Sequence, residues 1–177
     1  LARPDARPIF YNPVLGQFPV GEGGELAWGE WNARFRDWWR SFVNQDDWVL
    51  NASEAGIDGG GTITGSSDLY AHNGRGPTAS YNFITIHDGF TMYDLVTYPE
   101  KQNSCGPLNP ICCEDPTSSW CETDSGEDHN RSRDWGSDPE GEALKRQMMR
   151  NFVTALMISH GTPLPLAGAE GSEDARG

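Results

Sequence analysis

The ionisable pair His87-Asp88 directly follows a short apolar run and directly precedes Gly89. The run, residues 83–86, is aromatic and β-branched without polar alternation, which predicts a strand buried on both faces of a parallel sheet. Active sites of α/β proteins gather at the carboxyl ends of such strands, so the pair is a candidate for chemistry. The local pattern leaves a second interpretation open, in which Asp88 caps the turn and His87 is a structural histidine.

Helices are expected on both sides of this pair. Thr91 and Asp94 have the Thr-x-x-acid spacing of a capping box, which predicts a helix start after the turn. Upstream, residues 27–43 carry a helical stripe of aromatic side chains that are expected to pack against the sheet. The stripe consists of Trp31, Phe35, Trp38 and Phe42.

The clearest helix is predicted at about residues 139–160. Ser137 with Glu140 has the spacing of a capping box, Pro139 suits the first turn, and a glycine lies just past the end. The second half, residues 153–158, is apolar all round, which predicts that it is buried.

Longer motifs follow one another in a fixed order along residues 10–170. They are Val14–Pro19, Glu30–Asp37, Gly65–Tyr70, Asn82–Tyr98, Lys101–Asn103, Arg146–Phe152 and Gly161–Leu164. This series resembles the isoamylases and glycogen debranching enzymes of the α-amylase superfamily. In that family Asn-Phe-x-Thr-x-His-Asp-Gly-Phe-Thr-Leu marks the seventh barrel strand, which the segment from Asn82 to Met92 matches.

The resemblance implies an α/β fold, the C-terminal part of a (β/α)8 TIM-type barrel from about strand five to strand eight. A whole barrel needs ~250 residues, so the 177 residues are expected to be an incomplete, partial catalytic domain. Its ends near 1–9 and 171–177 depart from the family pattern. A self-contained small domain is the alternative, although 21 Gly, 12 Pro and 36% hydrophobic residues are a thin supply for an independent core.

Site residues also follow from the resemblance. Asp88 matches the superfamily's third carboxylate, which stabilises the cationic transition state of a retaining glycosidase. His87 matches the histidine that hydrogen-bonds the sugar in the −1 subsite. The resemblance also implies a short strand at Trp28–Asn32, an alternative to the helical stripe in which Glu30 and Trp31 face the site. Trp31 and Asn32 are expected to bind substrate, by stacking on a glucose ring and by hydrogen bonding. The chemistry implies no cofactor and no metal.

The implied function is cleavage of α-1,6 branch linkages in glycogen or starch-type glucans, in the cytosol or a plastid. One departure weighs against activity of this chain alone: Arg3 stands where the family has its acid/base Glu, and a guanidinium cannot protonate a leaving group. A catalytically inactive glucan-binding subunit is therefore one alternative. An α-1,4-acting amylase-type enzyme is another, because it shares the His-Asp signature.

Net charge limits the classes of binding partner that are expected, and cysteine spacing bears on whether a metal is bound. The net charge of −13 argues against nucleic acid and anionic membranes, and a neutral branched α-glucan suits it. No apolar run approaches the ~20 residues of a membrane span. The four cysteines, Cys105, Cys112, Cys113 and Cys121, lie in a long loop over 99–137, and their spacing fits no standard zinc pattern. Free thiols are expected, and the oligomeric state is not indicated.

Overall fold

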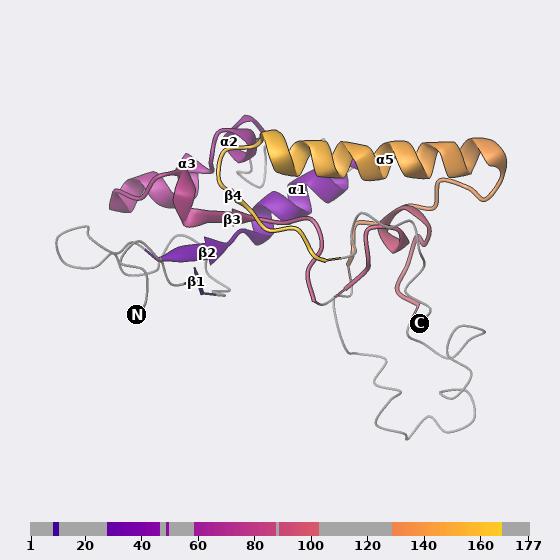
Figure 1. Ribbon diagram of the computed structural model, residues 1–177, viewed down its shortest axis with the longest axis horizontal. Helices are drawn as coiled ribbons and strands as arrows, with labels where there is room; N and C mark the ends of the chain where they lie inside the picture. Colours follow the sequence, from indigo (N-terminus) through magenta and orange to yellow (C-terminus); the bar gives the residue numbers. More distant parts are fainter. Residues whose placement is uncertain are drawn as a thin grey trace, which may run out of the picture. The chain divides into compact units, whose positions relative to one another are not determined.

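The computed structural model describes residues 9–10, 28–46, 49, 59–87, 89–102 and 129–167 (Figure 1). It divides into two compact units, which are described separately. Unit one comprises Leu1–Ile84 with Asn151–Pro165, and unit two comprises Thr85–Arg150 with Leu166–Gly177. The two ends of the chain, including Arg3 and residues 171–177, lie outside the described residues.

Unit one is built on a four-stranded, entirely parallel sheet. Its strands are β1 (Ile9–Phe10), β2 (Gly29–Trp31), β3 (Ser80–Asn82) and β4 (Thr162–Pro163). The strand order is β1-β2-β3-β4, so each strand pairs with the next one along the chain. Parallel neighbours of this kind need crossover connections, which is the pattern of an α/β protein. The predicted α/β class is confirmed.

The predicted strand at 83–86 is wrong in position. Strand β3 ends at Asn82, and its ladder with β4 ends at the pair Asn82–Pro163. The run behind it is buried from Phe83 to Thr85, as expected. Strand β4 is only two residues long, so the sheet ladder does not continue along this run. The carbonyl of Ile84 accepts a hydrogen bond from the side chain of Arg40.

Helix α1 (Ala33–Val43) follows β2 directly. Its buried stripe runs through Phe35, Trp39 and Val43, whereas Phe42 is 51% exposed and Trp38 is half-buried. The predicted packing of Trp38 and Phe42 against the sheet is therefore wrong. Those two rings stack on each other instead, with centroids 4.9 Å apart and planes 11° from parallel.

The connection from α1 to β3, where the structure describes it, contains short turns of helix over residues 59–79. They are α2 (Gly59–Ile63), α3 (Ser67–Tyr70), η2 (Ala71–Asn73) and η3 (Pro77–Ala79), where η marks a 3-10 helix. In unit two, η4 (Asp94–Val96) is the one helical turn behind the Thr91–Asp94 motif. The described parts of the long loop, 99–102 and 129–137, hold neither helix nor strand.

Helix α5 (Pro139–Ile158) crosses the boundary between the units. Its cap is Asp138, whose carboxylate accepts from the N–H of Gly141 at 2.7 Å, and not the predicted pair Ser137 and Glu140. Asp138 caps the helix because its short side chain places a carboxylate oxygen next to the unpaired N–H groups of the first turn.

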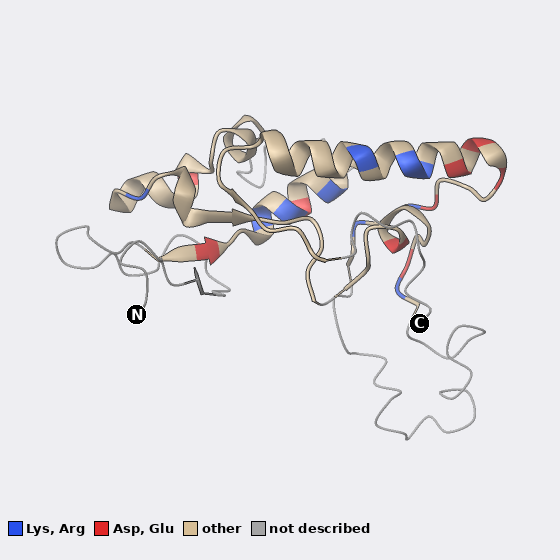
Figure 2. Cartoon of the chain, viewed as in Figure 1, with Lys and Arg blue, Asp and Glu red and all other residues tan. Residues whose placement is uncertain are grey.

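Charge divides α5 along its length. The charged side chains lie between Glu140 and Arg150, and the last eight residues of the helix, 151–158, carry no charge (Figure 2). In that uncharged part Phe152 and Leu156 are buried, but Met157 is 56% exposed and Ile158 is exposed too. The predicted burial of all of 153–158 is wrong, because only one face of the helix packs. No helix among the described residues is long and apolar enough to cross a membrane.

Candidate functional site

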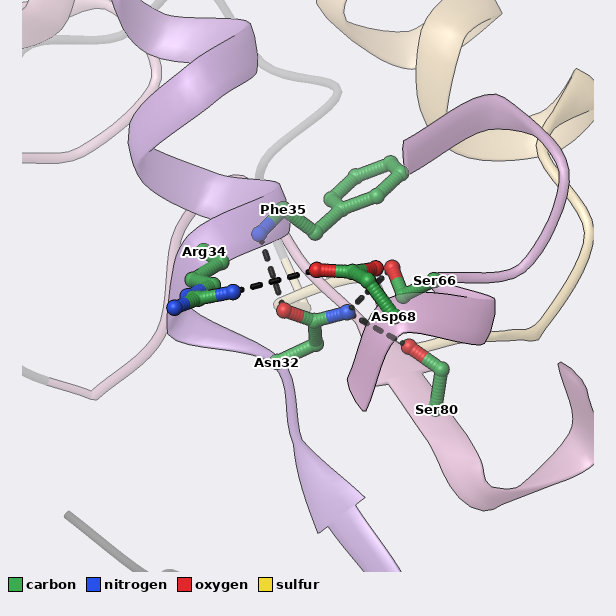
Figure 3. A network of polar contacts seen from close by, with 6 residues as sticks. All are labelled: Asn32, Arg34, Phe35, Ser66, Asp68 and Ser80. Carbon is green, nitrogen blue, oxygen red and sulfur yellow. Dashed lines mark hydrogen bonds and ion pairs between the residues drawn. The ribbon is translucent and has the colours of Figure 1, made fainter. Parts of the chain in front are cut away.

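Asn32 is the polar residue at the carboxyl end of β2, and its side chain is 0% exposed. Its amide oxygen accepts from the N–H of Phe35 at 2.9 Å, which caps α1. Its amide nitrogen donates to the hydroxyls of Ser66 at 2.9 Å and Ser80 at 2.8 Å (Figure 3). Both of its side-chain N–H donors are therefore used within the chain.

The network continues across the sheet. Ser80 donates to the amide oxygen of Asn82 at 2.6 Å, and the amide nitrogen of Asn82 donates to the carbonyl of His160 at 3.1 Å. Asn32, Ser80 and Asn82 thus join the start of α1, strand β3 and the lead into β4 through buried hydrogen bonds. Buried polar networks of this kind are stabilising when every member is satisfied.

Trp31, the last residue of β2, is half-buried. Its ring meets Phe83 edge-on, with centroids 6.3 Å apart, and the guanidinium of Arg36 lies 5.9 Å from the centre of the same Phe83 ring. The contact with Phe83 helps to orient the indole. Tryptophan side chains at the carboxyl end of a strand can stack on a sugar ring.

A buried ion pair joins β2 to the loop between η2 and η3. Oε1 of Glu30 and Nη1 of Arg75 are 2.6 Å apart with both side chains fully buried, and Arg75 also donates to the carbonyl of Trp28. The guanidinium of Arg75 stands 5.0 Å over the ring of Tyr70. Burial raises the pKa of the Tyr70 phenol above its ordinary value of 10, and the carboxylate of Glu30 adds to that rise. Tyr70 is therefore neutral at physiological pH.

His87 falls in unit two and is exposed. Asp88 lies outside the described residues, and its role stays a prediction. Gly89 has a φ of +72°, which confirms that the chain turns on this glycine after His87. The N–H of the next residue, Phe90, donates to the buried amide oxygen of Asn130 at 3.0 Å.

The Thr91–Asp94 capping box is confirmed by geometry. The carboxylate of Asp94 accepts from the Thr91 N–H at 3.2 Å and from the Thr91 hydroxyl at 2.7 Å, and the Asp94 N–H donates back to that hydroxyl at 3.2 Å. The reciprocal bonds close the turn that follows Gly89. The motif caps a single 3-10 turn because η4 ends at Val96.

The four predicted site residues divide between the units. Trp31 and Asn32 are neighbours in unit one, and His87 belongs to unit two. Of the two in unit one, Trp31 is half-buried, whereas the full burial of Asn32 favours a structural role over a sugar contact. The structure leaves the predicted substrate contacts of Trp31 and His87 as predictions.

Two buried polar residues that bond the backbone on either side of His87 in sequence were not predicted as site residues. Arg40 is 1% exposed and bonds the carbonyl of Ile84, and Asn130 is 4% exposed and bonds the N–H of Phe90. Arginine is almost never fully buried, so nothing in the local pattern of α1 marks Arg40. Asn130 lies in a stretch without helix or strand, so no periodicity marks it either.

In the part of the chain that the structure describes, no group of three or more His, Cys, Asp or Glu side chains could hold a metal ion. All four cysteines, Cys105, Cys112, Cys113 and Cys121, lie outside that part, so their predicted free state remains a prediction.

The chain is 38% identical over 177 residues to a "Glycogen operon protein GlgX homolog" of Mycobacterium tuberculosis, which is 90% of this chain and 22% of that protein. It is 37% identical over 165 residues to "Isoamylase 1, chloroplastic" of Oryza sativa subsp. japonica, covering 88% of this chain and 17% of the relative.

A "Glycogen debranching enzyme" of Escherichia fergusonii is 34% identical over 176 residues, with 89% and 24% covered. The chain thus spans about a fifth of the length of the curated relatives it matches. No protein-family model matches it.

Proposed function

The chain belongs to the isoamylase type of the α-amylase superfamily, and on that premise we propose that the protein carrying it is a debranching glycoside hydrolase. Its substrate is a branched α-glucan, such as glycogen, amylopectin or a limit dextrin, in which it cleaves α-1,6-glucosidic linkages. The single observation that carries this proposal is the identity of 34–38% along about nine-tenths of the chain to proteins named for glycogen debranching or as isoamylases.

The proposed fold is the later half of a (β/α)8 barrel, in which β1 to β4 are strands five to eight. The sequential, parallel order β1-β2-β3-β4 supports this, because consecutive barrel strands pair in that order. The helix α1 between β2 and β3 and the helix α5 between β3 and β4 fit the alternation of strand and helix. The carboxyl ends of these strands then carry the substrate site.

The proposed mechanism is retaining hydrolysis. Such an enzyme needs a nucleophilic carboxylate and an acid/base carboxylate about 5 Å apart, and we assign neither to a residue of this chain. Asp88 is proposed to stabilise the positive charge of the oxocarbenium-like transition state, and His87 to hydrogen-bond the sugar. Trp31 is proposed to stack on a glucose ring, and Asn32 to act indirectly by fixing the end of β2 next to it.

The proposed location is the cytosol or a plastid, which is supported by the name of the Oryza sativa relative, a chloroplastic isoamylase. A second function is favoured by one observation: Arg3 occupies the place of the family's acid/base Glu. A protein without that acid would bind glucan and not hydrolyse it.

The variant Asp88→Asn, in the protein as its gene encodes it, tests the proposal. Asn keeps the shape but removes the charge, so turnover on branched dextrin should fall by roughly 10²–10³-fold, equivalent to ~3–4 kcal/mol. Affinity for a non-hydrolysed glucan should change little. The matched control is Asp138→Asn, which removes the same charge and keeps a capping side chain for α5.

The outcomes separate the candidates. Loss of turnover in Asp88→Asn with normal turnover in the control supports the hydrolase. A wild-type protein that binds glucan but releases no reducing ends supports the binding subunit. Normal turnover of Asp88→Asn with a lowered melting temperature would mean that Asp88 is only a turn cap.

A further inference from the structure

We infer that Arg40 and Asn130 are positioning residues, which fix the two ends of the segment from Ile84 to Phe90. In sequence this segment contains His87 and Asp88. The kinetic part of the inference rests on the proposed function, and the structural part stands without it.

The first anchor is the guanidinium of Arg40. It lies inside unit one, 1% exposed, and its Nε donates to the carbonyl of Ile84 at 2.8 Å. That carbonyl lies two residues past the last ladder pair of β3, so the sheet itself no longer holds it. A buried charge is costly unless it is hydrogen-bonded, and a bond from a charged donor is roughly twice as strong as a neutral one. Arg40 therefore fixes where the chain leaves the sheet.

The second anchor is the amide of Asn130. It lies inside unit two, 4% exposed, and its oxygen accepts from the N–H of Phe90 across 40 residues of sequence. The backbone that carries Asn130 is itself fixed, because the N–H groups of Arg133 and Trp135 donate to the carbonyls of Leu95 and Val96. Asn130 therefore holds the Phe90 end of the segment against backbone that is itself hydrogen-bonded to η4.

The sequence between the anchors explains why both are needed. His87 is exposed, so the backbone that carries it contributes to where its side chain lies. Gly89 holds a left-handed φ of +72° that few other residues adopt, which restricts the turn further. A catalytic segment has to be fixed this well, because a misplacement of about 1 Å can cost 10²-fold in rate.

Paired substitutions test the inference in the protein as its gene encodes it. Asn130→Leu keeps the approximate size and removes the acceptor, whereas Asn130→Asp keeps an acceptor oxygen. Arg40→Met keeps the apolar stem and removes the donor, whereas Arg40→Lys keeps a charged donor. The control is Thr97→Val, which removes a side-chain to backbone bond of the same kind, from Thr97 to the carbonyl of Tyr93 at 2.8 Å.

The first readout is amide hydrogen exchange of the peptide covering residues 84–91, which needs no activity. Exchange should rise by at least about 10-fold in Asn130→Leu and Arg40→Met. It should stay close to wild type in Asn130→Asp and Thr97→Val. The second readout is the split of kcat and KM on branched dextrin. The kcat of Asn130→Leu should fall by roughly 10–100-fold with KM changed by less than about 3-fold.

Each outcome decides something different. Unchanged exchange in Asn130→Leu and Arg40→Met overturns the anchors. Raised exchange with unchanged kcat overturns their positioning role, as does an equal loss of kcat in Thr97→Val. If the wild-type protein has no hydrolase activity, the proposed function fails, and the exchange data alone then confirm or overturn the anchors. If Asn130→Leu does not fold, Arg40→Met and the Asp and Lys variants carry the same comparison.

Discussion

Replacing Asn32 with alanine removes three buried hydrogen bonds at once and gives the sharpest test of how the end of β2 is built. Loss of the cap on α1 should cost about 1 kcal/mol. The hydroxyls of Ser66 and Ser80 each lose a donor at 2.9 Å and 2.8 Å in a site closed to water, at about 1 kcal/mol each. We expect Asn32→Ala to lower the free energy of unfolding by about 3 kcal/mol.

The measurement is urea unfolding followed by tryptophan fluorescence, with a thermal melt beside it. A loss of this size should lower the melting temperature by roughly 6–12 °C. The control is Arg34→Gln, because Arg34 and Asp68 form an ion pair of 3.0 Å in the same cluster, with side chains 43% and 49% exposed (Figure 3). An exposed pair contributes little, so this variant should stay within about 0.5 kcal/mol of wild type.

The same variant distinguishes the structural role of Asn32 from the sugar contact predicted by resemblance. Asn32→Asp keeps an acceptor for the Phe35 N–H and lacks the two donors, so its stability should lie between wild type and alanine. If Asn32→Ala unfolds like wild type but binds branched dextrin far more weakly, the reasoning from burial is refuted and Asn32 contacts the sugar.

Three further outcomes follow from buried contacts. Glu30→Gln should lower the free energy of unfolding by about 3–5 kcal/mol, because Arg75 keeps a fully buried charge without its partner; a double variant with Arg75→Met that restores none of this loss in urea unfolding would contradict it. Gly161→Ala should cost about 1–3 kcal/mol in a thermal melt, because this glycine has a φ of +138° and a Cβ would meet the amide of Asn82 at 2.5 Å. Burial raises the pKa of Tyr70, so the folded state keeps the phenol proton to a higher pH than the unfolded chain does. The free energy of unfolding should therefore fall above about pH 10, by up to about 1.4 kcal/mol per pH unit. Tyr70→Phe should flatten that slope in alkaline unfolding curves.

Two features that depend on neighbours in sequence were predicted correctly, although the same spacing rule chose the wrong cap for α5. The Thr91–Asp94 capping box needs only residues three apart, and its reciprocal bonds are present. The turn on Gly89 rests on a backbone conformation that glycine adopts freely, and its φ is positive as expected. Local chemistry decides such features, so no tertiary information was needed.

Features that depend on a distant partner were not predictable. Helix α1 offers two overlapping aromatic stripes, one through Trp38 and Phe42 and one through Phe35 and Trp39, and both have helical spacing. The cap by Asn32 fixes where the helix begins, and the sheet then selects the stripe through Phe35 and Trp39. Periodicity gives the existence of an amphipathic helix but not which of two similar faces is buried.

The interior of unit one also shows why composition alone misjudges this chain. A hydrophobic content of 36% predicts a thin core, yet Glu30, Asn32, Arg40 and Asn82 are all at most 1% exposed. Each of them bonds a partner far away in sequence, so this interior depends on directional contacts as well as on apolar area. Directional contacts tolerate fewer replacements than apolar packing does.

We therefore expect substitutions at buried polar positions to lower stability more than substitutions at exposed apolar positions. Polar replacements at Met157, an exposed apolar position of α5, should change the free energy of unfolding by less than about 0.5 kcal/mol. Conservative replacements of the buried polar residues should cost several-fold more, because each leaves a distant buried group without its bond. A deep mutational scan of folding would measure both classes together. Greater sensitivity at Met157 than at Asn82 would mean that the apolar face of α5, and not the polar interior, dominates the stability of this chain.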